Sequence, residues 1–184
     1  TGEEAYSIGI CLHEYLSERS SPIKIQIFAT DISEKSITKA RIGIYSKKDL
    51  ENVSELRLGQ FFIKTNGGYQ IKKTIRNMCV FACHNFLKDP PFAKIDLISC
   101  RNALIYVEPV LQKKALTTFH YALKEKGFLI LGKSETTAQA AELFNSFDKH
   151  NKIYTRKETK EKLLHVIAGS REEIFRGFSY RSGK

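Results

Sequence analysis

Polar side chains able to bind a ligand occur at three points in the sequence, each directly after a stretch of apolar residues typical of a strand. They are Asp31, His84-Asn85-Phe86, and Cys100-Arg101-Asn102 with Tyr106 four residues further on. A carboxylate at the end of a strand can accept both hydroxyls of a ribose, and an amide beside an aromatic ring can bind an adenine and stack on it. In an alternative role, Asp31 caps a helix that begins near Ser33. Together the three clusters indicate a nucleotide-like ligand.

The elements that would position these residues alternate between strand and helix. Apolar stretches predict strands at 23–30, 78–83, 94–100, 128–131 and 152–155. Helical spacing predicts helices from the first residues to about 19, at 33–43, at 109–127 and, weakly, at 138–143. The first helix begins with the sequence motif of a capping box, Thr1-Gly2-Glu3-Glu4. This alternation predicts an α/β fold with a doubly wound sheet. Ligands bind such sheets outside the carboxyl ends of the strands, so the polar clusters would line one edge.

An antiparallel insertion interrupts the alternation. Two strand-like stretches at 61–65 and 69–72 flank Asn66-Gly67-Gly68, and such a turn sequence between two strands is typical of a hairpin. Residues 45–60, which precede it, predict only weak helix and loop. We therefore expect a hairpin over residues 61–72.

Composition and charge fit an ordinary globular domain. The 184 residues are 42% hydrophobic and 27% charged, and a chain of this length can bury a core without disulfides or a metal. The net charge of +10 is uneven, because residues 149–184 hold ten Lys and Arg against four Asp and Glu. A basic tail is usually solvated or a linker, which weakens the argument for nucleic acid. Every apolar stretch is shorter than the ~20 residues of a membrane helix, so membrane insertion is not expected.

The cysteines are Cys11, Cys79, Cys83 and Cys100, and they do not follow a metal-binding pattern. No two of them have the C-x-x-C spacing of a zinc or redox motif. In a strand, Cys79 and Cys83 would share a buried face with Phe81. We therefore expect no metal site, and four unpaired thiols indicate a reducing compartment, the cytoplasm.

Several motifs resemble those of the CheR-type chemotaxis-receptor glutamate methyltransferases. They lie at residues 1–8 (TGEEAYSI), 29–32 (ATDI), 40–45 (ARIGIY), 95–106 (IDLISCRNALIY) and 127–135 (GFLILGKSE). The block with Cys-Arg-Asn and the later Tyr is the most specific, and the resemblance runs in order from residue 1 to about 157. Three further motifs look like the branch fused to a CheB-type methylesterase: Asp89-Pro90-Pro91-Phe92, Tyr106-Val107-Glu108-Pro109 and Phe119-His120-Tyr121-Ala122-Leu123.

The resemblance implies a domain organisation. Residues 1–157 would form a Rossmann-like methyltransferase domain that binds S-adenosylmethionine and releases S-adenosylhomocysteine, with the hairpin as the family's small antiparallel subdomain. The family's helical N-terminal domain and first central strand are missing from this segment, which implies a domain truncated at its N-terminus. Residues 158–184 would be a basic tail or linker. Within it, the sequence at 163–174 predicts a strand, a turn and a helix. These would either take the place of the missing central strand of the sheet or form a linker helix.

The resemblance also implies residue roles. The implied cofactor-binding residues are Glu4, Asp31, Asn85, Phe86, Cys100, Arg101 and Asn102. Asp31 would bind the ribose, and Asn85 and Phe86 would lie beside the adenosine. Tyr106 would face the transferred methyl group, and Arg101 or Tyr106 would orient the acceptor carboxylate, which makes these two the candidate catalytic residues.

The implied reaction forms methyl esters on glutamate side chains of coiled-coil chemoreceptors, with a fused or associated methylesterase and sensory domains as further partners. A glutamate with a pKa of about 4.3 is already ionised at neutral pH, so it needs neither a general base nor a metal. The enzyme must supply an in-line approach in a site that excludes water. A segment that lacks one wall of that site is not expected to be fully active alone.

Two other functions remain open from the sequence. A non-catalytic cofactor-binding or interaction module of a sensory fusion protein would carry the same cofactor-side residues. A nucleic-acid amine methyltransferase would use the tetrapeptide at 89–92, but that motif belongs at the carboxyl end of a strand. Here it precedes the strand predicted at 94–100, at the opposite end from the cofactor edge.

Overall fold

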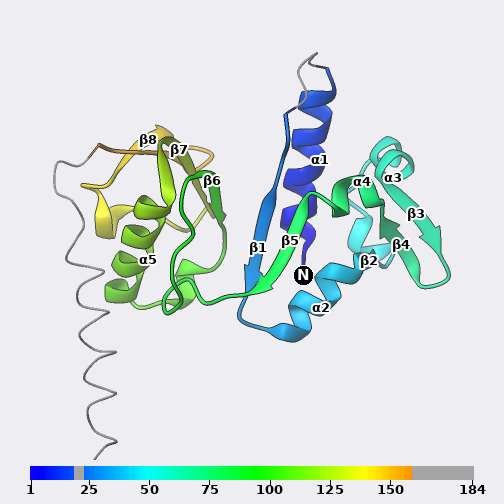
Figure 1. The fold of residues 1–184 in the computed structure, drawn as a ribbon, viewed down its shortest axis with the longest axis horizontal. Helices are drawn as coiled ribbons and strands as arrows, with labels where there is room; N and C mark the ends of the chain where they lie inside the picture. Colours follow the sequence, from blue (N-terminus) through cyan, green and yellow to red (C-terminus); the bar gives the residue numbers. More distant parts are fainter. Residues whose placement is uncertain (19–22, 159–184) are drawn as a thin grey trace, which may run out of the picture. The chain divides into compact units, whose positions relative to one another are not determined.

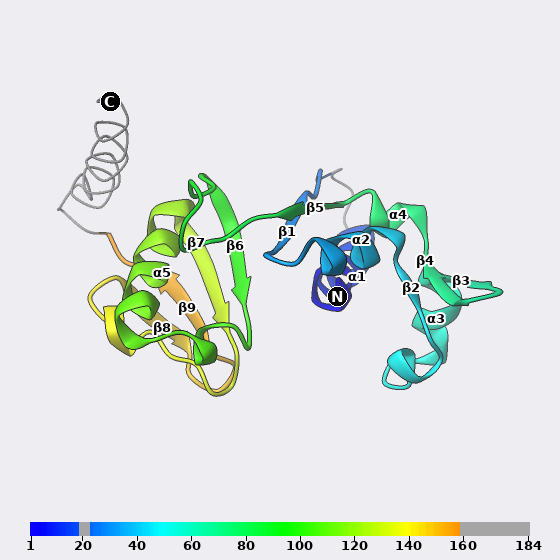
Figure 2. The same cartoon turned by 90° about the horizontal axis from the view of Figure 1, so that it is seen from below.

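The computed structural model describes residues 1–18 and 23–158, which form two compact units. The first unit is Thr1–Asn85 and the second begins at Phe86. Figures 1 and 2 show the helices and strands of both units. The strand and helix predicted at 163–174 lie outside the described residues. No helix in the described part of the chain is long and apolar enough to cross a membrane.

The first unit is built on two parallel strands. β1 (Ile27–Asp31) pairs with β5 (Cys79–Cys83), with Asp31 opposite Cys83. The helices α1 (Glu3–Ser17) and α2 (Glu34–Ile42) pack against the strands, and α4 (Lys73–Arg76) packs against α1 (Figure 1). Their apolar sides form one core with residues such as Tyr6, Ile37 and Ile75. The two strands end at the same edge, as parallel pairing requires.

The predicted hairpin is confirmed, and a third strand joins it. β3 (Phe62–Thr65) and β4 (Gly68–Ile71) pair antiparallel, and β2 (Ile44–Tyr45) adds to the other side of β4. The 3-10 turn η1 (Lys48–Leu50) and α3 (Glu55–Phe61) connect β2 to β3. Gly68 has a φ of 131°, and an added Cβ would lie 2.2 Å from the carbonyl oxygen of Tyr45. Only glycine fits there, because neither the conformation nor the space admits a side chain.

The second unit is a four-stranded sheet with the order β6-β7-β9-β8. β6 (Ile95–Cys100) and β7 (Leu123–Leu131) run parallel, while β9 (Ile153–Arg156) is antiparallel to both β7 and β8 (Phe144–Asp148). Between the strands lie η2 (Leu104–Tyr106), α5 (Pro109–Ala122) and η3 (Ala138–Ala140). The core of this unit joins α5 to the sheet through Leu116, Leu129 and their neighbours.

Several predicted boundaries are wrong for physical reasons. The helix predicted to reach Gly127 ends at Ala122, because Leu123 already pairs with β6 and is 1% exposed. Helical spacing placed Leu123 on the stripe of α5, but strand pairing buries it just as well. The strand predicted from residue 23 begins only at Ile27. The helix predicted at 138–143 is a single 3-10 turn at 138–140.

Two further details differ from the sequence analysis. The capping box is wrong: the N-cap of α1 is Gly2, with a φ of 91°, and no side chain caps the helix. The hydroxyl of Thr1 donates to the carboxylate of Glu3, whereas a capping box would need it to accept from a backbone N–H of the first turn. β8 was missed, because Asn145 and Ser146 interrupt its apolar pattern and are poor strand formers.

Candidate cofactor site

Asp31 lies at the carboxyl end of β1, where the nucleotide-binding prediction placed it. Its Oδ1 accepts a hydrogen bond from the backbone N–H of Ser33 at 2.8 Å. The helix cap is Ser33 itself, whose hydroxyl accepts from the N–H of Ser36. Asp31 thus stabilises the turn between β1 and α2 but does not cap the helix. Its side chain is exposed, and Oδ2 has no hydrogen-bond donor among the described residues, so it remains available to a ligand hydroxyl.

Asn85 follows the same edge of the first unit. The backbone N–H of His84 donates to the carbonyl of Asp31 at 3.1 Å, which extends the β1–β5 pairing by one residue. Asn85 is the next residue and the last of this unit. The structure therefore brings Asp31 and the His84-Asn85 segment to one edge of one sheet. The third predicted cluster follows β6, which belongs to a different hydrogen-bonded sheet in the second unit.

Glu4 lies in the first turn of α1, which two buried tyrosines hold in place. Tyr6 donates its hydroxyl to the carbonyl of Ala40 at 2.7 Å, and the hydroxyl of Tyr45 donates to the carbonyl of Thr1. Burial raises the pKa of Tyr6 to about 12 and also raises the pKa of Tyr45. Both phenols therefore stay protonated and act as donors. They fix the start of the helix that carries the exposed Glu4 side chain.

The end of β6 and the segment after it, in the second unit, carry four of the predicted residues. Cys100 ends the strand opposite Leu131. Arg101 and Asn102 follow as exposed residues, and Asn102 has a left-handed φ of 57°. Tyr106 closes η2 with its side chain 84% exposed. One turn therefore presents both candidate catalytic side chains and Asn102, and we name residues 100–106 the β6 turn.

Phe86 also belongs to the second unit, but it is not a freely presented aromatic ring. Its ring lies 5.6 Å from that of Phe119 and packs against the core around α5. A half-buried position leaves part of the ring available for stacking. Glu4, Asp31 and Asn85 are thus positioned by the first unit, and the other predicted residues by the second.

A residue that the sequence analysis did not single out organises the β6 turn. Glu135 is 4% exposed, and its carboxylate accepts four backbone hydrogen bonds, three of them from residues 102–104. It stands at the end of the 127–135 motif, so the resemblance contained it without assigning it a role. The signal in the sequence was a lone acidic residue after a buried strand, which is not specific.

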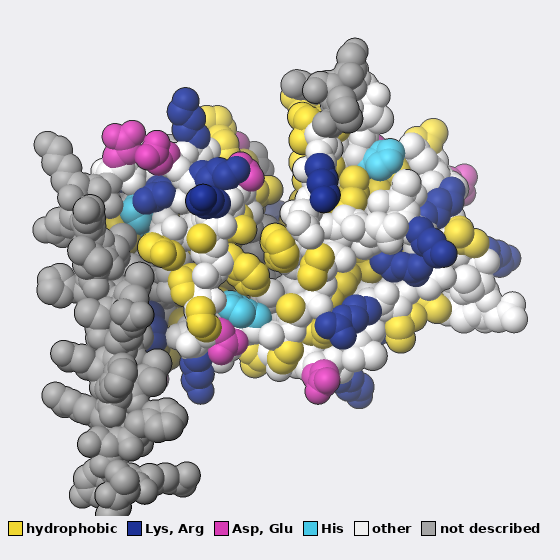
Figure 3. Space-filling model, in the orientation of Figure 1, with side chains coloured by type: hydrophobic (Ala, Val, Ile, Leu, Met, Phe, Trp, Pro, Cys, Tyr) yellow, Lys and Arg dark blue, Asp and Glu magenta, His cyan; other side chains and the backbone are white. Residues whose placement is uncertain are grey.

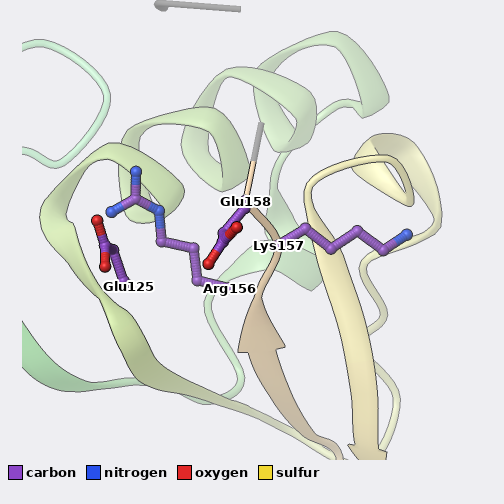
Figure 4. A pocket seen from close by; sticks show the side chains of 4 residues that line it. All are labelled: Glu125, Arg156, Lys157 and Glu158. Atoms are coloured by element: carbon purple, nitrogen blue, oxygen red, sulfur yellow. The ribbon is translucent and has the colours of Figure 1, made fainter. Parts of the chain in front are cut away.

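Three other possible kinds of site in the described residues, namely a metal cluster, a pocket and the tetrapeptide motif, involve no residue predicted to bind the cofactor. No cluster of three or more His, Cys, Asp or Glu there could hold a metal ion. A pocket at the end of β9 is lined by Glu125, Arg156, Lys157 and Glu158 (Figure 4), none of which was predicted to contact the cofactor. The tetrapeptide 89–92 lies in the loop before β6, at the opposite end of that strand from the β6 turn.

The comparisons with known proteins decide the family. The model of the family described as "CheR methyltransferase, SAM binding domain" matches residues 1–153. The chain belongs to this family. The match confirms the Rossmann-like methyltransferase fold and identifies S-adenosylmethionine as the cofactor of the domain.

Relatives agree with this assignment. The chain is 37% identical over 145 residues to a putative methyltransferase, Cher3, of Pseudomonas putida, which covers 74% of this chain and 51% of that protein. It is 34% identical over 144 residues to the chemotaxis protein methyltransferase of Escherichia coli, covering 73% and 49%. An uncharacterised 104.1 kDa protein of Rhodobacter capsulatus is 36% identical over 154 residues, covering 84% and 16%. The chain thus spans about half or less of the relatives it matches.

Proposed function

We propose that the protein containing this chain transfers a methyl group from S-adenosylmethionine to glutamate side chains of chemotaxis-type receptors, forming methyl esters. The observation that carries the proposal is the match of the chemotaxis methyltransferase family over residues 1–153. Relatives that bear the name chemotaxis protein methyltransferase are 32–34% identical to the chain. The exposed side chains of the β6 turn support it, because they leave two polar groups available to an acceptor carboxylate.

The residues present fit the cofactor. The Oδ2 of Asp31 lies at the end of a parallel strand and has no hydrogen-bond donor within residues 1–18 and 23–158, which suits the hydroxyls of a ribose. The amide of Asn85 follows the neighbouring strand at the same edge. The β6 turn supplies Cys100, Arg101 and Asn102 at the end of a second parallel pair. When bound, the cofactor supplies an electrophilic methyl group on a sulfonium.

The chemistry asks the chain for positioning. The acceptor glutamate is ionised at neutral pH and attacks the methyl carbon directly, so no protein group has to remove a proton. Arg101 pairs with the acceptor carboxylate and draws it to the β6 turn. The hydroxyl of Tyr106 donates to one carboxylate oxygen and leaves the other aligned for attack. Holding the reactants in line is worth effective molarities of about 10⁵ to 10⁸ M in favourable cases.

We further propose a receptor coiled coil as the substrate and the cytoplasm as the place of action. Figure 3 shows Lys and Arg side chains spread over the part of the first unit that carries α4 and the β3–β4 hairpin. The basic residues of these elements include Lys64 in β3, Lys72 directly after β4, and Lys73 and Arg76 in α4. They suit a partner with acidic side chains, such as the glutamate-rich segments that the enzyme would methylate. Fused or associated methylesterase and sensory domains are part of the same proposal.

Two assays on the intact protein test the proposal. Calorimetry with S-adenosylhomocysteine should show one binding site, and that site should weaken in Asp31→Asn. Incubation with labelled S-adenosylmethionine and receptor-like coiled-coil peptides should transfer label to the peptides. Binding without transfer would favour the non-catalytic module instead. Transfer to DNA or RNA, with a strong dependence on salt, would favour the nucleic-acid methyltransferase.

A further inference from the structure

Glu135 holds together two loops that follow neighbouring parallel strands. Its Oε1 accepts from the N–H groups of Ala103 at 2.8 Å and Leu104 at 2.7 Å. Its Oε2 accepts from the N–H groups of Asn102 at 3.0 Å and Gly132 at 2.6 Å. Three of the donors belong to the β6 turn and the fourth to the loop after β7. One side chain therefore ties the β6 turn to the end of the next strand.

The arrangement requires an ionised carboxylate. A carboxylate presents acceptors on both oxygens, and here all four partners are donors. An amide of the same shape would point its NH₂ group at two N–H groups and leave them buried without an acceptor. Charge-assisted hydrogen bonds are also stronger than neutral ones. Because Glu135 is 4% exposed, water cannot easily replace the lost contacts.

The backbone conformation and the free space around the carboxylate of Glu135 both match its position. Asn102 adopts a left-handed φ of 57°, which costs a non-glycine residue free energy and needs surrounding contacts to persist. At Gly132, an added Cβ would lie 2.7 Å from Oε2 of Glu135 and 3.0 Å from the backbone nitrogen of Asn102. A side chain at this position would therefore push the carboxylate away from its donors. The loop of Glu135 also closes on itself, since its N–H donates to the carbonyl of Gly132 at 3.0 Å.

We infer that Glu135 is a positioning residue that sets the conformation of the β6 turn and thereby the placement of Arg101, Asn102 and Tyr106 for the cofactor and the acceptor. The inference rests on the proposed function for what the turn binds. The backbone donors that Glu135 occupies are not available to a ligand. Its effect on binding therefore passes through the geometry of the turn, and it does not touch the cofactor itself.

The first test compares Glu135→Gln with Glu142→Gln in the intact protein. Glu142 lies seven residues further on, with its side chain 59% exposed and a 3.9 Å ion pair to Lys113. We expect Glu135→Gln to weaken S-adenosylhomocysteine binding roughly tenfold or more, the effect of losing charge-assisted hydrogen bonds. We expect Glu142→Gln to leave it unchanged. Equal affinity of wild type and Glu135→Gln would overturn the inference.

A second readout needs no ligand and separates positioning from general stability. Hydrogen exchange of the amides of residues 102–104 and 132 should accelerate in Glu135→Gln while amides in β7 keep their protection. Leu129→Ala, which opens a cavity in the core of the same unit, should lower the melting temperature without this local change. Uniform acceleration throughout the unit, or no acceleration at the turn, would show that Glu135 has only a structural role or none.

Gly132→Ala provides a variant that retains the carboxylate. The added methyl should displace Oε2 and reproduce the local exchange and the weaker binding of Glu135→Gln, and a Gly132→Ala protein with wild-type exchange and affinity would contradict the inference. If wild type itself fails to bind S-adenosylhomocysteine, the proposed function fails, and the exchange data still decide whether Glu135 sets the turn.

Discussion

Replacing Tyr106 with phenylalanine separates a catalytic role of its hydroxyl from a structural one. The side chain is 84% exposed, and its hydroxyl makes no hydrogen bond to another described residue. Its removal should therefore change the free energy of unfolding by less than about 0.5 kcal/mol, as for surface substitutions in general.

The cost should appear in methyl transfer. If the hydroxyl donates to the acceptor carboxylate, its loss removes a hydrogen bond to a charged group, worth about 1.5–3 kcal/mol. That corresponds to a decrease in kcat/KM of roughly 10- to 150-fold. A bond that orients the acceptor only in the transition state would lower kcat, whereas one made equally in the bound substrate would raise KM.

The assay measures initial rates of labelled methyl transfer with the intact protein, together with thermal unfolding. Tyr121→Phe is the matched control, because Tyr121 lies on α5 of the same unit, is 45% exposed and has no predicted role. We expect it to keep both activity and stability. Unchanged kcat and KM in Tyr106→Phe would refute the role of the hydroxyl. A large decrease in the free energy of unfolding would contradict the conclusion that the hydroxyl makes no stabilising contact within the protein.

Three further changes have outcomes set by the structure. Burial lowers the pKa of His120, which is 0% exposed, and its Nε2 lies 2.9 Å from the carbonyl of Lys157. The imidazole therefore binds a proton more readily in the unfolded state than in the folded state. As a result, the free energy of unfolding decreases as the pH falls below about 6.5, the pKa of an ordinary histidine. The melting temperature should fall less between pH 7.5 and 5.5 in His120→Gln than in wild type or in the exposed control His150→Gln. Asp31→Asn should weaken S-adenosylhomocysteine binding with little change in the free energy of unfolding, since Ser33 is the one described residue that donates to the carboxylate. Wild-type affinity in Asp31→Asn would show that Asp31 does not bind the cofactor. Gly68→Ala should destabilise the hairpin by more than about 1 kcal/mol, seen as faster exchange of β3 and β4 amides, and wild-type exchange would contradict the crowding at Tyr45.

The sequence predicted the parts of the fold that depend on local pattern. The strands ending at Asp31, Cys83 and Cys100 were visible because apolar runs stop at polar residues there, and the hairpin because its turn sequence is distinctive. The end of α5 was not predictable in this way. Leu123 satisfies both a helical stripe and a strand, and only pairing with β6 decides between them.

The candidate site was predicted unevenly for a similar reason. Exposed residues at strand ends, such as Asp31 and Tyr106, follow from topology and from the resemblance. The role of Glu135 does not, because it depends on four backbone N–H groups from two loops converging on one carboxylate. Nothing in the types or spacing of nearby side chains records that convergence.

The chemical nature of the product tests the central claim most directly. The intact protein would be incubated with methyl-labelled S-adenosylmethionine and a receptor-like coiled-coil peptide, beside the same peptide with its glutamates replaced by glutamine. The proposal predicts label on the glutamate peptide alone, released as methanol by mild base because the product is an ester. Label that resists base, or that appears equally on the glutamine peptide, would contradict glutamate methylation.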